Sequence, residues 1–457
     1  MKTIVMTLST SAEVKNIMRT RVLETLLSDP DIRLVCFVPH KKLEYYRKEF
    51  IRDRVIIQPV VDLEYGLSRA RAFWRSLSYN SVPTETVRIR SNKQFFDQPS
   101  FFQFCALLWK KPVWVLGHLR AWRELVRWIE FRFFAEDIAV WKPLFEQYKP
   151  DLALATNPVH GTNIAFMKYA RRCGVKLVGM MKTWDNLSSK GLLLVKPDRL
   201  IVPNRVVFKD ALTLGDMLKE RVFDGGCPQY DDYFKSEFEM TREEICAELK
   251  ADPVKPVLLY CMGGIMNQDD PSEHLLMLDR AIEDGRLPPA TIVLRSHPKY
   301  DVRALQLNQF KHVSFYQPGQ KVSDMAGEWE LNDRDIKILM NSVRHADVEY
   351  NTGSTMTLES AIYGQPIVLI GFDGYKNRPY YQSVRHGLDV THYNIVQATG
   401  GVWRVDNEVE LITATKGYLA DQTIHADGRK RMVEELVGTV DGKAGERIGQ
   451  FVLSQLA

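Results

Sequence analysis

Residues 346–374 contain a strand pattern, a short turn and a helix pattern, and the turn carries side chains that could bind a phosphate. An alternating run ends at Asn351, and Gly353, Ser354 and Thr355 then precede a segment of helical spacing. At such a junction in a parallel sheet, glycine lets the backbone approach a ligand, and the first helical N–H groups attract anions. The hydroxyl groups of Ser354 and Thr355 add two hydrogen-bond donors. The pattern therefore predicts a phosphate-binding turn, although an ordinary Ser or Thr helix cap explains the same residues.

Polar residues follow this turn on the same side of the predicted sheet. Glu359 lies one helical turn further on, where its carboxylate could accept hydrogen bonds from a ribose diol. A glutamate in a first helical turn also suits the helix dipole, so this residue has a purely structural explanation as well. Asp373 and Gly374 follow the next strand, and we expect them to contact a donor or an acceptor.

Two more strand ends in this half carry residues suited to a diphosphate. The segment "LRSHPKYD" brings Arg295, His297 and Lys299 to the end of one strand, where cationic side chains can bind phosphate oxygens. A structural histidine that bonds a loop is the alternative for His297. The segment "YCMGGIMNQDD" places Gly263 and Gly264 directly after another strand. Three such strand ends in one half favour a phosphate site over three unrelated caps.

The first half offers candidates for acid–base chemistry. His160, in "TNPVHGTN", comes just beyond a strand end and could take a proton from an attacking hydroxyl. The segment "MKTWDNLSSKG" contains Trp184, which we expect to contact the donor or the acceptor, and Asp185, a second candidate base. The context is turn-rich, so Asp185 also fits an Asx turn or a helix cap.

The elements that position these residues alternate between strand and helix, which predicts an α/β fold with parallel sheets. We expect a Rossmann-like domain at residues 1–230 with a helical insertion of two or three helices at about residues 65–149. A charged linker follows at residues 231–255, a second Rossmann-like domain at residues 256–435, and a terminal helix at residues 436–457.

Composition limits the function classes. The chain has 457 residues, 45% of them hydrophobic, and a net charge of only +4, which argues against broad nucleic-acid binding. Its six cysteines form no C-x-x-C pair, so we expect no zinc site and a reducing compartment. The first residues lack a signal-peptide pattern, and no apolar run approaches the ~20 residues of a membrane span. We expect a cytoplasmic location.

The insertion is rich in aromatic and basic residues, among them Trp109, Trp114, Trp122, Trp128 and Phe131. Buried helix packing with a solvated basic edge is the interpretation that we favour, because tryptophan usually packs in cores. The alternative is a peripheral face at the inner side of a membrane that serves a lipid-linked acceptor.

These segments, over residues 175–380, resemble the GT-B fold glycosyltransferases, and in particular CDP-glycerol glycerophosphotransferases and related cell-surface polysaccharide transferases. The family's Thr-Trp-His-Gly segment is similar to Thr183, Trp184 and Asp185, with aspartate in the histidine's place. Its Arg-Pro-His-Pro motif resembles the segment from Arg295 to Pro298. Its Tyr-Ser-Ser loop is similar to Gly353, Ser354 and Thr355, and Glu359 resembles the glutamate of sugar-nucleotide GT-B enzymes.

The resemblance implies two domains facing a cleft and a metal-independent transfer without a cofactor, in which the nucleotide-activated donor is the substrate. It implies that Asp185 replaces the family's histidine as general base, a role for which His160 competes. It also implies that Arg295, His297 and Lys299 stabilise the leaving diphosphate together with Ser354 and Thr355. We find no Asp-x-Asp pair in a strand–helix context, which agrees with the absence of a metal.

The expected function is transfer of a sugar from a UDP- or CDP/CMP-linked donor to a glycan or lipid-linked acceptor in surface polysaccharide synthesis, such as capsule or lipopolysaccharide. The alternatives are a CDP-glycerol or CDP-ribitol phosphotransferase and a UDP-GlcNAc 2-epimerase. The "GST…E" loop fits the epimerase, but the further carboxylates and early basic loop of that family are not found. A non-catalytic nucleotide-binding protein is the fourth alternative.

Overall fold

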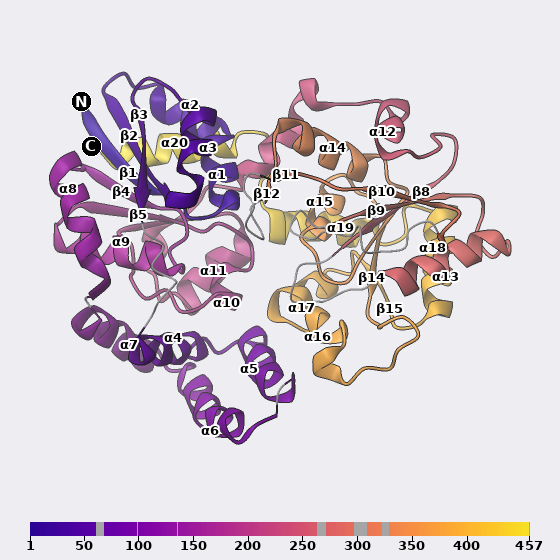
Figure 1. Cartoon of the computed structure of the whole chain (residues 1–457), viewed down its shortest axis with the longest axis horizontal. Helices are drawn as coiled ribbons and strands as arrows, with labels where there is room; N and C mark the ends of the chain where they lie inside the picture. Colours follow the sequence, from indigo (N-terminus) through magenta and orange to yellow (C-terminus); the bar gives the residue numbers. More distant parts are fainter. Residues whose placement is uncertain are drawn as a thin grey trace. The chain divides into compact units, whose positions relative to one another are not determined.

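The computed structural model describes residues 1–60, 68–97, 99–134, 136–262, 271–296, 309–321 and 329–456. The chain forms two compact units, one from residues 1–234 and 437–457 and the other from residues 235–436. Each unit is an α/β layer structure around one parallel sheet (Figure 1). Most of the expected linker therefore lies inside the second unit, and the C-terminal segment returns to the first.

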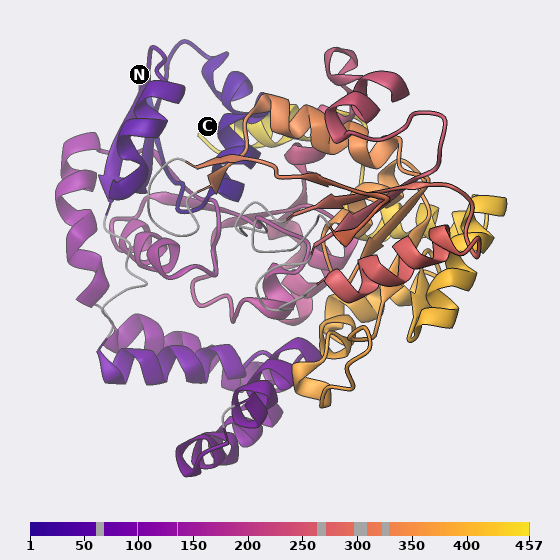
Figure 2. The same ribbon diagram turned by 45° about the vertical axis from the view of Figure 1, so that its right-hand side comes forward.

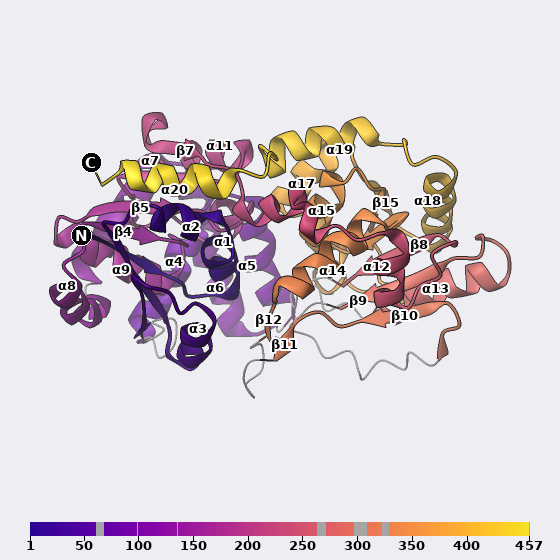
Figure 3. The ribbon, with the colours of Figure 1, turned by 90° about the horizontal axis from the view of Figure 1, so that it is seen from above.

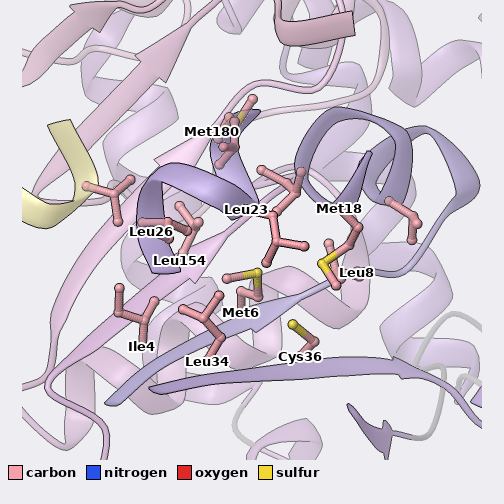
Figure 4. Packing of buried hydrophobic residues seen from close by; sticks show 14 of the residues in the cluster. Ile4, Met6, Leu8, Met18, Leu23, Leu26, Leu34, Cys36, Leu154 and Met180 are labelled. Carbon is pink, nitrogen blue, oxygen red and sulfur yellow. The ribbon is translucent and has the colours of Figure 1, made fainter. Parts of the chain in front are cut away.

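The first unit is built on a seven-stranded parallel sheet of order β3-β2-β1-β4-β5-β6-β7. Apolar residues alternate between its two faces: Ile4 and Met6 point to one core, and Val5 points to the other. Figure 4 shows Ile4 and Met6 packed among residues of neighbouring strands and of the helix that covers them. The strands are β1 (Lys2–Thr7), β2 (Ile32–Pro39), β3 (Val55–Val60), β4 (Leu152–Ala155), β5 (Lys176–Met180), β6 (Arg199–Val202) and β7 (Val222–Asp224).

Helices cover both faces of this sheet, as expected for parallel strands joined by crossovers. The C-terminal helix α20 lies along α2 (Figure 3), and small residues permit this close approach. A Cβ added at Gly449 would come within 2.5 Å of the Thr25 side chain. These helices are α1 (Ser11–Met18), α2 (Arg21–Leu27), α3 (Leu43–Glu49), α9 (Gly161–Arg172), α10 (Asn186–Ser189), α11 (Arg205–Thr213) and α20 (Ala444–Ser454).

The insertion between β3 and β4 contains more helices than the two or three expected. Its described residues form α4 (Arg69–Asn80), α5 (Glu85–Asp97), α6 (Phe101–Leu116), α7 (Arg120–Phe133) and α8 (Lys142–Tyr148). Pro83, Pro99 and Gly117 lie between successive helices, where proline and glycine interrupt helical structure.

Buried charges attach the insertion to the first unit. Asp216 accepts hydrogen bonds from Arg123 and Arg127, and all three side chains are at most 7% exposed. Glu130, fully buried, pairs with Arg71 and with Lys168. The hydrogen bonds of Arg71 and the charges of Arg71 and Lys168 hold the pKa of Glu130 below its usual value against the opposing effect of burial. Removing one partner from such a cluster is costly, because the remaining charge stays buried.

The second unit is built on a six-stranded parallel sheet of order β10-β9-β8-β13-β14-β15. A separate antiparallel pair joins β11 (Gln320–Lys321) to β12 (Trp329–Glu330). The strands of the main sheet are β8 (Val257–Cys261), β9 (Thr291–Arg295), β10 (Val313–Tyr316), β13 (Val348–Asn351), β14 (Ile367–Ile370) and β15 (Trp403–Val405).

Two apolar layers enclose this second sheet. Leu258 and Tyr260 face one helical layer, whereas Leu259 and Cys261 face the other. Figure 2 shows helices on both sides of this sheet. The helices are α12 (Arg242–Leu249), α13 (Ser272–Glu283), α14 (Asp333–Arg344), α15 (Met356–Ile362), α16 (Arg385–Leu388), α17 (Thr391–Ala398), α18 (Glu408–Ala420) and α19 (Ala426–Met432). Among the residues that the structure describes, no helix combines the length and apolar character needed to cross a bilayer.

Candidate functional site

The strand order of the second sheet locates its ligand edge. Numbered along the chain within this unit, the strands run 3-2-1-4-5-6, so the chain changes direction across the sheet between β8 and β13. In open parallel sheets, ligands bind outside the carboxyl ends of the strands at this switch point. The predicted phosphate turn follows β13 directly and therefore lies at that point.

The backbone of the turn agrees with the glycine found there. Gly353 has a φ of +114°, which residues with a side chain rarely adopt. The side-chain oxygen of Asn351 accepts hydrogen bonds from the N–H groups of Gly353, at 2.8 Å, and Ser354, at 3.0 Å. These two N–H groups are therefore occupied within the turn.

The donors left at the turn belong to Ser354 and Thr355. Thr355 is exposed, and within the described part of the chain its N–H group donates to no residue. Ser354 is half-buried, and its hydroxyl oxygen accepts a weak bond from the N–H of Met356 at 3.4 Å. An anion at this turn would meet two hydroxyl groups and one backbone N–H.

Arg295 lies at the end of β9, two strands away from the turn, with its side chain directed toward α15. Its Nη1 is 3.9 Å from the sulfur of Met356, the first residue of that helix. The residue is only 6% exposed, and its Nε has no hydrogen-bond partner among the described residues. A buried guanidinium N–H without a hydrogen-bond acceptor lowers the stability of the folded protein, and a bound acceptor would remove this cost. The structure thus places Arg295 near the predicted turn.

Two carboxylates lie on the same side of the second sheet. Glu359 is 6% exposed in α15, and Glu349 is fully buried in β13. Burial raises the pKa of Glu349 to about 8, and the charge of Glu359 adds to this rise, while hydrogen bonds from Asn351 and Cys261 oppose it. Asn351 donates to both carboxylate oxygens of Glu349, at 3.0 and 2.9 Å.

A hydrogen-bond network behind the turn was missed by sequence reasoning. The hydroxyl of Tyr393, in α17, donates to the carbonyl of Ser354 at 2.6 Å and lies 3.0 Å from the hydroxyl of Thr357. Thr357 also accepts from Asn351 at 2.9 Å. Asparagine side chains often accept a hydrogen bond from the backbone N–H two residues on, and this tendency could have identified Asn351. No sequence signal links Tyr393 to a turn about forty residues earlier.

Asp373 is held within its own loop, whereas Gly374 contacts α13. Asp373 accepts a hydrogen bond from the N–H of Val384 at 2.8 Å. The N–H of Gly374 donates to His274 at 3.1 Å, and a Cβ at this glycine would come within 2.3 Å of the Glu273 carboxylate. Both residues border a groove of about 590 Å³ beyond the ends of β14 and β15.

The first unit has an equivalent switch point between β1 and β4, and Glu13 lies there. This buried carboxylate accepts bonds from the N–H of Ser9, at 2.6 Å, and from the side chains of Thr156, at 3.2 Å, and Asn157, at 3.1 Å. Sequence reasoning also missed Glu13. The spacing Thr10-x-x-Glu13 matches a capping box and could have identified it.

Asp185 and His160 occupy neighbouring loops after β5 and β4. Asn157 connects the loops: its carbonyl accepts from the N–H of His160, at 2.9 Å, and its side chain accepts from Asn186, at 3.0 Å. His160 is half-buried and precedes the first residue of α9.

The carboxylate of Asp185 is bound by its own loop. Thr183 donates to it at 2.7 Å and Ser189 at 2.6 Å, and the Lys190 ammonium lies 3.2 Å away. Asp185 precedes α10, and the adjacent Trp184 is buried. These contacts come from side chains within the loop, and the Asp185 side chain makes no cap bond to the start of α10, so the helix-cap interpretation is wrong. The charge remains available for chemistry at a sheet edge.

Four predicted residues, His297, Lys299, Gly263 and Gly264, lie outside the described residues. Within the described ranges, no group of three His, Cys, Asp or Glu side chains is arranged to hold a metal ion.

No protein-family model matches the chain, and no curated protein sequence matches it. Solved structures do match over nearly the whole length. The Staphylococcus aureus MnaA–UDP structure is 14% identical with a TM-score of 0.58, covering 100% of this chain and 97% of that chain. A putative UDP-N-acetylglucosamine 2-epimerase from Listeria monocytogenes is 11% identical with a TM-score of 0.56, covering 100% and 96%. The Neisseria meningitidis UDP-GlcNAc 2-epimerase bound to UDP-GlcNAc is 11% identical with a TM-score of 0.55, covering 99% and 100%.

At these identities the likeness concerns the fold alone. Together with the two parallel sheets, it confirms the expected GT-B fold with two Rossmann-like domains. Two of these three structures carry the name UDP-GlcNAc 2-epimerase, so the expectation of a glycosyltransferase is not confirmed.

Proposed function

We propose that this chain is an enzyme that acts on a sugar activated by a nucleoside diphosphate. The observation that carries the proposal is the buried Arg295, whose Nε lacks a partner among the described residues, close to a glycine turn at the switch point of the second sheet. A diphosphate would supply the missing acceptor, and Ser354 and Thr355 would add donors. Glu359, one helical turn further on, would accept bonds from the ribose.

Two of the matched structures are named as complexes with UDP or UDP-GlcNAc, which supports a uridine nucleotide as the first ligand to test. We propose transfer of the sugar to a glycan or lipid-linked acceptor as the reaction. In this step the bond between the sugar carbon and the phosphate oxygen breaks and the acceptor oxygen bonds to that carbon. A base, Asp185 or His160, takes the acceptor's proton, and the nucleoside diphosphate leaves. The reaction needs no metal in this proposal.

The second candidate is 2-epimerisation of UDP-GlcNAc, favoured by the full-length likeness to two structures with that name. Inversion at C2 requires loss of the C2 hydrogen and return of a proton from solvent. The candidates for this proton transfer in the first unit are the carboxylates of Glu13 and Asp185, which lie at the edge of the sheet. Both already accept several hydrogen bonds from the protein.

One experiment separates the candidates. The protein is treated with EDTA, and its thermal unfolding is followed with UDP, CDP, GDP and CMP and with the corresponding activated sugars. Stabilisation by one diphosphate without metal supports the binding proposal, and no shift with any compound contradicts it. The stabilising sugar is then incubated in D₂O with and without glycan acceptors. Deuterium at C2 without an acceptor identifies the epimerase, whereas an acceptor-dependent product that retains the C2 hydrogen identifies the transferase.

A further inference from the structure

Helix α6 exposes an apolar face to its surroundings. Phe101 is 84% exposed, Phe104 47% and Leu108 59%. With the exposed Lys111 and with Val115, these residues follow one another at intervals of three and four, so they share one face of the helix. The 16 residues of α6 make this face about 24 Å long.

The opposite side of α6 packs against α4 and α5 (Figure 1). The ring centroid of Trp109 lies 5.0 Å from that of Phe73, and the indole N–H of Trp114 donates to the carbonyl of Thr84 at 3.0 Å. These contacts fix the orientation of the helix, so the apolar face is presented by a supported element. The interpretation that the aromatic residues pack inside the insertion therefore holds for Trp114. It does not hold for the outer face of α6, which carries Phe101, Phe104 and Leu108.

Helix α7 shows the same combination of exposed aromatic and basic residues. Leu125 is 45% exposed and Trp128, three residues later, is 59% exposed. The exposed Arg132 follows Trp128 by four residues, so the three share one face of the helix. Of the large apolar side chains that are exposed in the described structure, most belong to residues 73–133. Exposed apolar residues concentrated in this way mark an interaction surface.

The charge of the insertion indicates what this surface binds. Residues 68–134 contain twelve Lys and Arg but only four Asp and Glu, although the whole chain has a net charge of +4. All four acidic side chains lie in ion pairs with basic residues of the first unit. Lys111, on the apolar face itself, has no ion-pair partner among the described residues. The surface therefore combines aromatic residues with uncompensated positive charge.

We propose that the outer face of α6, with the exposed face of α7, docks the protein on a bilayer that contains anionic lipids. The aromatic and aliphatic side chains enter the headgroup region, and Lys111 and Arg132 contact lipid phosphates. At 16 residues α6 is shorter than the ~20 needed for a span, so it lies along the surface. A second copy of the chain suits the face less well, because a two-fold contact would place the basic residues of one copy against those of the other. The proposal does not depend on the nature of the substrate.

The test is vesicle flotation of the full chain. Vesicles of phosphatidylcholine and phosphatidylglycerol (3:1) should carry the protein upward at least ten times more efficiently than pure phosphatidylcholine vesicles at 0.1 M salt. Phe101→Ser/Phe104→Ser/Leu108→Ser should lose most of this binding, and Lys111→Gln/Arg132→Gln should lose the preference for anionic vesicles. Ile51→Ser/Val254→Ser/Val409→Ser is the matched control, because these side chains are 83%, 89% and 76% exposed elsewhere. It should bind like the parent.

Circular dichroism and thermal unfolding confirm that each variant is folded. No flotation with anionic vesicles overturns the proposal, as does equal flotation of the parent and the α6 variant. Light scattering after gel filtration supplies the rival outcome: a dimer that the α6 substitutions dissociate, without vesicle binding, would make this face a contact between copies.

Discussion

The guanidinium of Arg295 lies 3.9 Å from the sulfur of Met356, at the first turn of α15, and is almost fully buried there. This contact joins the end of β9 to the helix that follows the glycine turn. It brings together two segments that are sixty residues apart in the sequence, and it positions a cation where a diphosphate would complete its hydrogen bonding.

Replacing Arg295 with methionine should weaken UDP binding about 10- to 100-fold, because a hydrogen bond to a charged group contributes about 1.5–3 kcal/mol. Methionine retains the apolar stem next to Met356. Arg286→Met is the control, since Arg286 precedes the other end of β9 and pairs with Asp284 and Glu408. Titration calorimetry on both variants provides the measurement. Equal affinity of Arg295→Met and the parent would remove this residue from the site.

Glu359→Gln should lower the affinity for UDP about tenfold but leave the affinity for 2′,3′-dideoxy-UDP unchanged. The reason is that only the ribose hydroxyls donate to the carboxylate, and such a bond is stronger when the acceptor is charged. The ratio of the two dissociation constants, measured for parent and variant, separates loss of the ribose contact from a general loss of affinity. A ratio that stays the same in the variant would contradict contact with the ribose.

Asp185→Asn should reduce turnover at least 100-fold with little change in KM if this carboxylate is the general base. Ser189→Ala removes one donor to the same carboxylate but leaves its charge, so we expect less than a tenfold effect. Steady-state kinetics and melting temperatures distinguish catalysis from support of the loop. Full turnover with a lowered melting temperature would leave Asp185 only the support of its own loop.

Glu349 should make stability depend on pH. Its pKa is raised from 4.5 to about 8, so the folded state holds a proton that the unfolded chain releases. Stability from this group is therefore fully present below about pH 4.5 and is lost as the pH rises to about 8, by up to about 1.4 kcal/mol per pH unit. The glutamine of Glu349→Gln cannot ionise. The melting temperature of this variant should therefore rise relative to that of the parent as the pH increases from 5 to 8. A constant difference across this range would show that the parent carboxyl does not titrate there.

Asp216→Asn should destabilise the first unit by about 3–5 kcal/mol, because it leaves Arg123 and Arg127 buried without their anion. Glu146→Gln breaks an exposed pair with Lys142 and should change stability by less than about 1 kcal/mol. Urea unfolding of both variants gives the comparison. Similar small effects would mean that the buried cluster does not anchor the insertion.

The sheets could be predicted because their strands are short apolar or alternating runs at regular spacing, and the strand expected to end at Asn351 does end there. The helices of the insertion were harder to predict from the sequence. Its apolar residues continue at helical spacing through the breaks at Pro83 and Gly117, so the pattern indicated fewer and longer helices than the five that form between residues 69 and 148.

The candidate site could be predicted where one strand end determines it and not where tertiary contacts do. Arg295 and the Gly353 turn were identified because parallel strands bring their carboxyl ends to one edge. The support of that turn by Tyr393 depends on how α17 packs, which no local pattern specifies. The capture of the Gly353 and Ser354 N–H groups by Asn351 likewise depends on a side-chain rotamer.

A crystal structure of the protein with UDP tests the central claim most directly. We predict the diphosphate within hydrogen-bonding distance of the Arg295 guanidinium and of the Thr355 N–H, with the ribose hydroxyls on Glu359. A diphosphate bound elsewhere, for example in the groove beyond β14 and β15, with Arg295 still lacking a partner, would contradict the assignment.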